Sequence, residues 1–163
     1  MRIAFILASL ALLALPAQAQ HAHGEGRLDI VIEKDRLAIN LELPLDAAVG
    51  FERAPKNDKE KAALAAARQA VADPALFVPT PLAGCKADVP KVVLPDFGKA
   101  GGEQHADIEA SHTFQCTNPA ALKSVETTLF KSFKRLYRLE ARRAGPSGQG
   151  AARLTPKNPV IAW

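Results

Sequence analysis

Histidine and carboxylate side chains recur at a spacing of two residues in two places along the chain. His21 and His23 form a pair, and His105, Asp107 and Glu109 form a second group. On a β-strand, side chains two residues apart share one face and lie roughly 6–7 Å apart, so they can converge on one ion. Zinc takes about four nitrogen, oxygen or sulfur ligands. Two such groups on neighbouring strands would be enough for a zinc site of His21, His23, His105 and Asp107, with Glu109 as a spare ligand. The alternative is that the histidine pair belongs to an unordered N-terminus and binds no ion.

The start of the chain has the pattern of a secretory signal peptide. Arg2 provides a positive charge, residues 3–15 are almost all apolar, and Ala17 and Ala19 have the small-residue spacing that signal peptidase recognises. The apolar run is shorter than the roughly 20 residues that span a bilayer. We therefore expect a signal peptide at 1–19, a mature domain at 20–163, and a periplasmic protein without a membrane-inserted segment.

The two cysteines fit that compartment. Exported proteins fold where thiols are oxidised, so a disulfide between Cys85 and Cys116 is expected. Two cysteines are too few for a cysteine-based zinc site. The net charge of +4 is modest and does not indicate a nucleic-acid partner.

The elements that must hold these side chains follow from hydrophobic periodicity. Alternation over 28–32 and 37–43 predicts a hairpin with one buried face. Asn57, with Glu60 three residues later, predicts the start of a helix that ends at Ala72. The remaining elements are a loop with an edge strand over 78–95, a strand over 103–116, and a hairpin with strands 136–144 and 151–155. The prediction is a single α+β domain: an antiparallel β-sheet with one main covering helix and a disulfide.

The strand at 103–116 also predicts the role of the fourth histidine. His112 alternates in phase with apolar residues such as Ile108 and Phe114, whereas His105, Asp107 and Glu109 are on the opposite face. We therefore expect His112 to be a buried core residue with a hydrogen-bond partner rather than a metal ligand.

Two other features suggest different functions. The segment GPSGQG lacks the lysine and hydroxyl residue of a phosphate-binding loop, so a turn is expected. A basic cluster could bind an anionic partner, although its alternation with other residues favours a solvated strand face: Lys131, Lys134, Arg135, Arg138, Arg142 and Arg143. The alternative function is therefore an exported interaction module that uses this basic C-terminal hairpin to hold an envelope partner, with no specific metal role. No nucleophile stands beside a base and an acid, so an enzyme is not expected.

Four segments together resemble the ZrgA-like family of exported zinc-binding proteins, which is linked to zinc uptake in proteobacteria. They are HAHGEGRLDIVI at 21–32, GFERAPKNDKEKAAL at 50–64, HADIEASHTFQC at 105–116 and PSGQGAARLTPKNPVI at 146–161. The resemblance implies a periplasmic protein that binds zinc and assists its acquisition, alongside an importer or the importer's periplasmic binding protein. His21, His23, His105 and Asp107 occupy positions that match the family's metal-compatible motifs.

The chain departs from this family pattern at two places. Family members usually carry a long histidine-rich run before the HAD segment, where this chain has only DFGKAGGEQ, and Glu109 stands where a histidine is common. The first departure argues against high-capacity zinc storage, so about one zinc per chain is expected. The second leaves the ligand set open. Copper remains a competitor because it generally binds nitrogen sites more tightly than zinc.

Overall fold

The computed structural model describes residues 23–98 and 106–163, and the predicted signal peptide, His21 and His105 lie outside them. A seven-stranded sheet has the order β4-β6-β2-β1-β8-β9, with β5 also paired to β6, and a three-stranded sheet has the order β10-β7-β3. The strands are β1 (Glu25–Glu33), β2 (Arg36–Pro44), β3 (Phe77–Pro79), β4 (Cys85–Ala87), β5 (Lys91–Val93), β6 (Asp107–Cys116), β7 (Ser124–Thr127), β8 (Arg138–Gly145), β9 (Gly148–Leu154) and β10 (Val160–Ala162).

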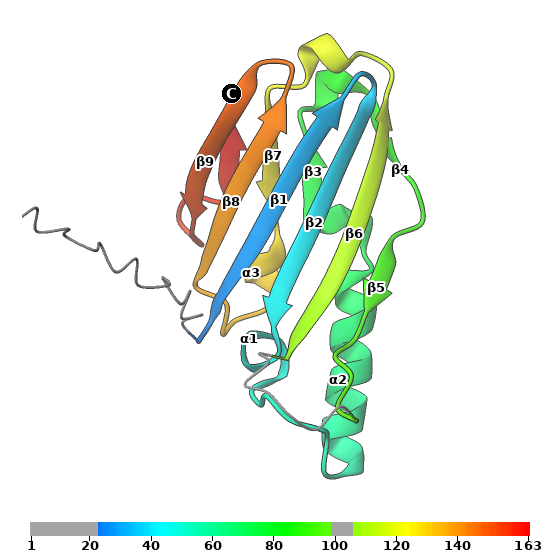
Figure 1. Ribbon diagram of the computed structural model, residues 1–163, viewed down its shortest axis with the longest axis vertical. Helices are drawn as coiled ribbons and strands as arrows, with labels where there is room; N and C mark the ends of the chain where they lie inside the picture. The colour runs from blue at the N-terminus through cyan, green and yellow to red at the C-terminus, as the bar shows by residue number, and fades with distance from the viewer. Residues whose placement is uncertain (1–22, 99–105) are drawn as a thin grey trace, which may run out of the picture.

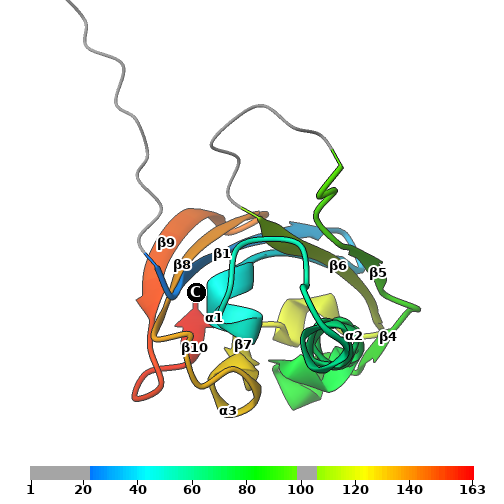
Figure 2. The ribbon, with the colours of Figure 1, turned by 90° about the horizontal axis from the view of Figure 1, so that it is seen from below.

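The helices and the small sheet cover one face of the large sheet. The α-helices are α1 (Leu45–Val49), α2 (Asp58–Val71) and α3 (Leu129–Ser132), and short 3₁₀ helices span Pro74–Leu76, Pro81–Ala83 and Pro119–Ala121. Figure 1 shows the large sheet face-on, and Figure 2 shows it curving over α1, α2 and the second sheet. The core fills the space between these layers, and the outer face of the large sheet is polar. Within the described residues, no helix is long and apolar enough to cross a membrane.

The β1–β2 hairpin confirms the pattern predicted from alternation. Leu28, Ile30 and Ile39 are almost fully buried, and Ile30 pairs with Ile39 in register. The turn between the strands includes Lys34 at φ 53, the left-handed region in which L residues are uncommon. Every second residue of the hairpin therefore faces the core, and the others face outward.

Helix α2 begins and ends where its capping residues predict. The Asn57 side chain accepts a hydrogen bond from the Glu60 N–H, and the Glu60 carboxylate accepts from Arg53 and from the Lys56 N–H. These bonds, the one from Arg53 foremost, lower the pKa of Glu60 to about 2. The helix buries only a narrow stripe: Leu64, Ala67 and Val71.

Strand β6 carries both the buried histidine and the disulfide. His112 is 1% exposed, its Nε2 lies 2.9 Å from the Val71 carbonyl oxygen, and its ring meets Phe77 edge-on. Burial lowers the pKa of His112. Cys85 on β4 pairs in register with Cys116 and is joined to it by the predicted disulfide. The predicted burial of His112 with a hydrogen-bond partner and the predicted disulfide are confirmed.

The C-terminal hairpin joins the sheet in an arrangement that the sequence did not reveal. Strands β8 and β9 are antiparallel, and Gly145 pairs with Gly148 across a two-residue turn, so the turn is tighter than predicted. Strand β8 also runs parallel to β1, as the single parallel pairing in the described sheets. The predicted α+β class, single domain and disulfide are confirmed; the parallel pair and the second sheet complete the architecture.

Candidate metal centre

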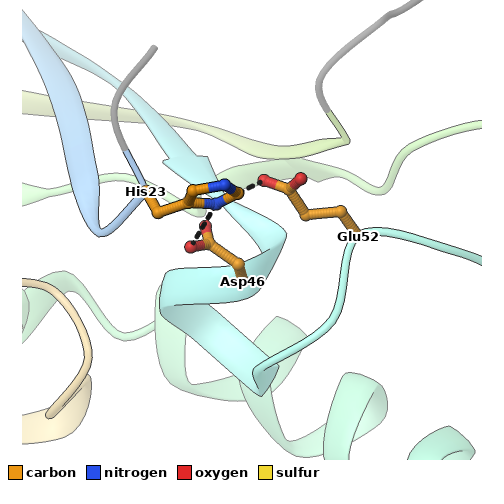
Figure 3. Close-up of side chains that lie close together, drawn as sticks. All are labelled: His23, Asp46 and Glu52. Atoms are coloured by element: carbon orange, nitrogen blue, oxygen red, sulfur yellow. Dashed lines mark hydrogen bonds and ion pairs between the residues drawn. The ribbon is translucent and has the colours of Figure 1, made fainter.

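One histidine and two carboxylates gather at one end of the large sheet. The His23 Nδ1 lies 3.1 Å from Asp46 Oδ2 and 3.7 Å from Glu52 Oε1 (Figure 3). One potential ligand atom from each of the three residues lies within 4.8 Å of the other two. The His23 side chain is 82% exposed, whereas those of Asp46 and Glu52 are 20% and 31% exposed. The group is therefore open to solvent on the histidine side and shielded on the carboxylate side.

Helix α1 fixes the two carboxylates. It starts directly after β2, where the Leu45 N–H donates to the Ala106 carbonyl at 2.8 Å, and Leu45 and Ala47 are buried. Asp46 lies between these two buried residues in the first turn of α1, so its side chain points away from the core. Gly50 ends α1 at φ 88, a left-handed conformation that suits glycine, and its N–H donates to the Asp46 carbonyl. This reversal brings Glu52 back beside Asp46.

The strand end that follows His23 is held by Tyr137. Gly24 has φ +74, and its carbonyl accepts a hydrogen bond from the Tyr137 N–H at 3.0 Å. A Cβ at Gly24 would lie 2.7 Å from the Arg135 carbonyl oxygen and 2.7 Å from the Tyr137 ring. The Tyr137 hydroxyl donates to the Glu25 carboxylate at 2.9 Å, which raises the pKa of Tyr137. The backbone adjoining His23 is therefore tightly packed although the imidazole is exposed.

The donor set fits a zinc ion with one position left open. Zinc is bound by imidazole nitrogen and carboxylate oxygen at about 2.0–2.2 Å, so ligand atoms of a tetrahedral site lie about 3.3 Å apart. The ligand atoms of the three residues lie within 4.8 Å of one another, and small side-chain rotations of His23 and Glu52 would bring them to the spacing of a tetrahedral site. Asp46 Oδ1 is buried and has no hydrogen-bond partner among the described residues. A cation bound by the Asp46 carboxylate would offset the cost of this unpaired oxygen, since buried polar atoms without a partner are destabilising.

The structure brings together a different set of residues from the one predicted. Strand β1 begins at Glu25, so His23 lies in the preceding turn and not on the strand. Asp107 pairs with Pro44, and Glu109 is exposed opposite Glu42, both at the start of β6. Neither belongs to the group around His23. His21 and His105 lie outside the described residues, so ligation by these four residues stays a prediction.

Sequence reasoning missed Asp46 and Glu52. Glu52 lies inside the quoted segment GFERAP, and Asp46 follows the end of a predicted strand, but neither has a histidine at ligand spacing. They meet His23 because α1 folds back onto the β1 end of the sheet. A local pattern of two-residue spacings cannot detect such a group.

The predicted basic cluster is dispersed rather than gathered into one patch. Arg138 forms ion pairs with Glu25 and Glu140, and Arg143 is 7% exposed, with its guanidinium 5.3 Å from the Trp163 ring. The solvated strand face that the sequence favours is therefore found for Arg138 and Arg142, whereas Arg143 is buried.

Comparison with known proteins assigns the family. The described residues form a single sheet-rich domain with a candidate metal group at one end of the large sheet. The model of the ZrgA family, described as zinc uptake proteins, matches residues 20–163. The chain belongs to this family, and the predicted resemblance is confirmed. A search of curated proteins finds no match.

Proposed function

We propose that the protein binds zinc through His23, Asp46 and Glu52 as an exported protein that supports zinc uptake. One observation carries the proposal: three ligand atoms of types that zinc accepts lie within 4.8 Å of one another. Membership of a zinc uptake family supports zinc as the ion carried.

The proposed role is carriage rather than catalysis. The exposed His23 leaves a side of the ion open, so a ligand from another protein can approach and the ion can exchange. We infer a periplasmic location, about one zinc per chain, and delivery to an importer or its periplasmic binding protein. His21, His105, Asp107 and Glu109 are the further ligands that the sequence predicts.

Zinc titration of the mature chain from Gln20, in competition with a chromophoric chelator, tests the site. His23→Ala, Asp46→Asn and Glu52→Gln should each weaken binding by at least about tenfold, since lost ligand interactions typically cost that much or more. Glu126→Gln removes an exposed carboxylate on β7 and is the matched control, expected to leave affinity unchanged. Undiminished one-to-one binding in all three site variants would place the zinc elsewhere.

A second series of variants defines the complete ligand set. His21→Ala, His105→Ala, Asp107→Asn and Glu109→Gln are titrated in the same way, first with zinc and then with Cu²⁺. A loss at His21 or His105 would extend the site, whereas no loss at any of the four would limit it to the three described residues. Since protons compete for imidazole, whose unperturbed pKa is about 6.5, affinity should fall as the pH drops below that value.

A further inference from the structure

The two edges of the large sheet differ in how they are protected. On one edge, β4 and β5 have three residues each, contain Lys86 and Lys91, and are joined by a segment that includes Pro90; Cys85 further ties β4 to β6. Short strands, lysine and proline are the devices that keep sheet edges from pairing with other chains. On the other edge lies β9 (Figure 1). It has seven residues, includes neither lysine nor proline, and is exposed over 148–151.

The register of the hairpin shows which backbone groups face outward. Gly145 and Gly148 pair directly across the two-residue turn, and hydrogen-bonded and non-hydrogen-bonded pairs then alternate along an antiparallel hairpin. Gln149, Ala151 and Arg153 are in the non-hydrogen-bonded pairs, so their N–H and C=O groups face away from β8. No described strand pairs with β9 on that side.

Side-chain contacts support the turn that leads into the edge strand. Beneath β9, the buried Arg143 donates hydrogen bonds to Ser147 Oγ and to the Gly148 carbonyl, and its guanidinium lies against Trp163. These contacts hold the turn and the first residues of β9. An incoming strand would therefore meet a preformed edge, which lowers the entropic cost of pairing.

A depression on the outer face runs inward from this edge. It has a volume of about 640 Å³, and its lining includes Asp29, Val31, Arg142, Ala144 and Ala151. Ala151 pairs with Arg142, which is exposed and makes no ion pair within the described part of the chain. The next pair toward the turn that faces outward is Ala144 with Gln149, and Ala144 lies beside Val31 on β1. A side chain passing over the small Ala151 therefore reaches Arg142, whose neighbour on β1 is Asp29. The side chain two residues along passes over Gln149 toward Ala144 and Val31.

We propose that β9 accepts an extended segment of a partner protein as an added strand. An acidic side chain of that segment faces Ala151 and pairs with Arg142, and an apolar side chain two residues away lies over Ala144. Main-chain hydrogen bonds supply the affinity in this mode of recognition, and the pockets for alternate side chains supply the specificity. The depression is lined by none of the three residues of the metal group and is independent of that group.

A symmetric peptide tests the proposal without assuming strand direction. The probe is acetyl-Thr-Val-Thr-Glu-Thr-Val-Thr-amide, and the matched probe has lysine in place of glutamate. Each is titrated into isotope-labelled mature protein while amide resonances and hydrogen exchange are followed, with zinc present and with a chelator. The glutamate probe should shift and protect the Gln149, Ala151 and Arg153 amides, and it should bind about tenfold more tightly than the lysine probe, the effect of one charge-assisted hydrogen bond.

Two variants separate the backbone and charge contributions. Arg142→Ala should reduce the preference for the glutamate probe to near unity, and Lys91→Ala on the opposite edge should leave it unchanged. Ala151→Pro removes an outward N–H and should abolish binding, with circular dichroism and the thermal midpoint reporting on the fold. If that variant does not fold, the wild-type protein provides the test: the glutamate probe should slow hydrogen exchange at the Ala151 amide, and an unchanged exchange rate would exclude the backbone hydrogen bond.

Several results would overturn the proposal. They are resonance shifts mapped away from β9, equal affinity for the two probes, or an Arg142→Ala variant that keeps the preference. Protection of the Ala151 amide that rises with protein concentration alone would show that a second copy of the chain, and not a partner segment, occupies the edge.

Discussion

Replacing Gly24 by alanine should damage the metal group through backbone packing, without removing a ligand. Gly24 has φ +74, where an L residue costs roughly 1–2 kcal/mol. The added Cβ would also lie 2.7 Å from the Arg135 carbonyl oxygen and 2.7 Å from the Tyr137 ring. Overpacking of this kind typically costs a further 1–3 kcal/mol, roughly. We expect a total loss of about 3 kcal/mol in the free energy of unfolding.

Gly148 provides the matched control for this substitution. It has φ +93, and nothing lies within 4 Å of the position of its missing Cβ. Gly148→Ala should therefore show only the conformational cost, roughly 1–2 kcal/mol. The difference between the two variants isolates the steric contribution at Gly24.

The assays are urea unfolding of both variants and zinc competition titration under conditions where both are folded. Since His23 adjoins the displaced peptide, zinc affinity should fall at least about tenfold in Gly24→Ala and stay unchanged in Gly148→Ala. Equal stability losses in the two variants would refute the steric argument. A Gly24→Ala variant that binds zinc with full affinity would refute the view that this packing positions His23.

Three further outcomes concern stability. Replacing Cys85 and Cys116 together by serine should cost about 4 kcal/mol by the chain-entropy estimate for their separation of 31 residues, measured by urea unfolding. The pKa of Glu60 is lowered from 4.5 to about 2, so its stabilising contribution is complete above pH 4.5 and is lost as the pH falls toward 2; Arg53→Ala should flatten the unfolding free energy over that window. The pKa of His112 is lowered from 6.5, so its contribution is complete above that value and declines below it; His112→Gln should remove this dependence in a pH series of thermal melts.

The sequence predicts the parts of this fold that depend on neighbours in the chain. Alternation with a period of two assigns Leu28 and Ile30 to the core and places His112 among core residues, because a strand directs successive side chains to opposite faces. The start of α2 at Asn57 is likewise local, since the cap is a hydrogen bond to a residue three positions later. The disulfide follows from the expected oxidising compartment and the presence of just two cysteines.

Local patterns contain less information about how the strands are ordered. The sequence indicates the β8–β9 hairpin through its turn residues, but the parallel pairing of β8 with β1 joins residues more than a hundred positions apart. Its register depends on which buried faces fit together in the completed core. The second sheet is built from strands of three or four residues, too short to show a period clearly.

The candidate metal group shows the same contrast between what local sequence patterns predict and what the tertiary structure decides. The sequence by itself determined the family, the buried faces and the caps and singled out His23 as a candidate ligand, because each depends on residue types at short spacing. Only the tertiary structure brought Asp46 and Glu52 to His23, since they lie 23 and 29 positions further along and meet it through the fold of α1 against the sheet. Ligand atoms converge in space rather than in sequence, so their grouping is decided when the core fixes where each element ends.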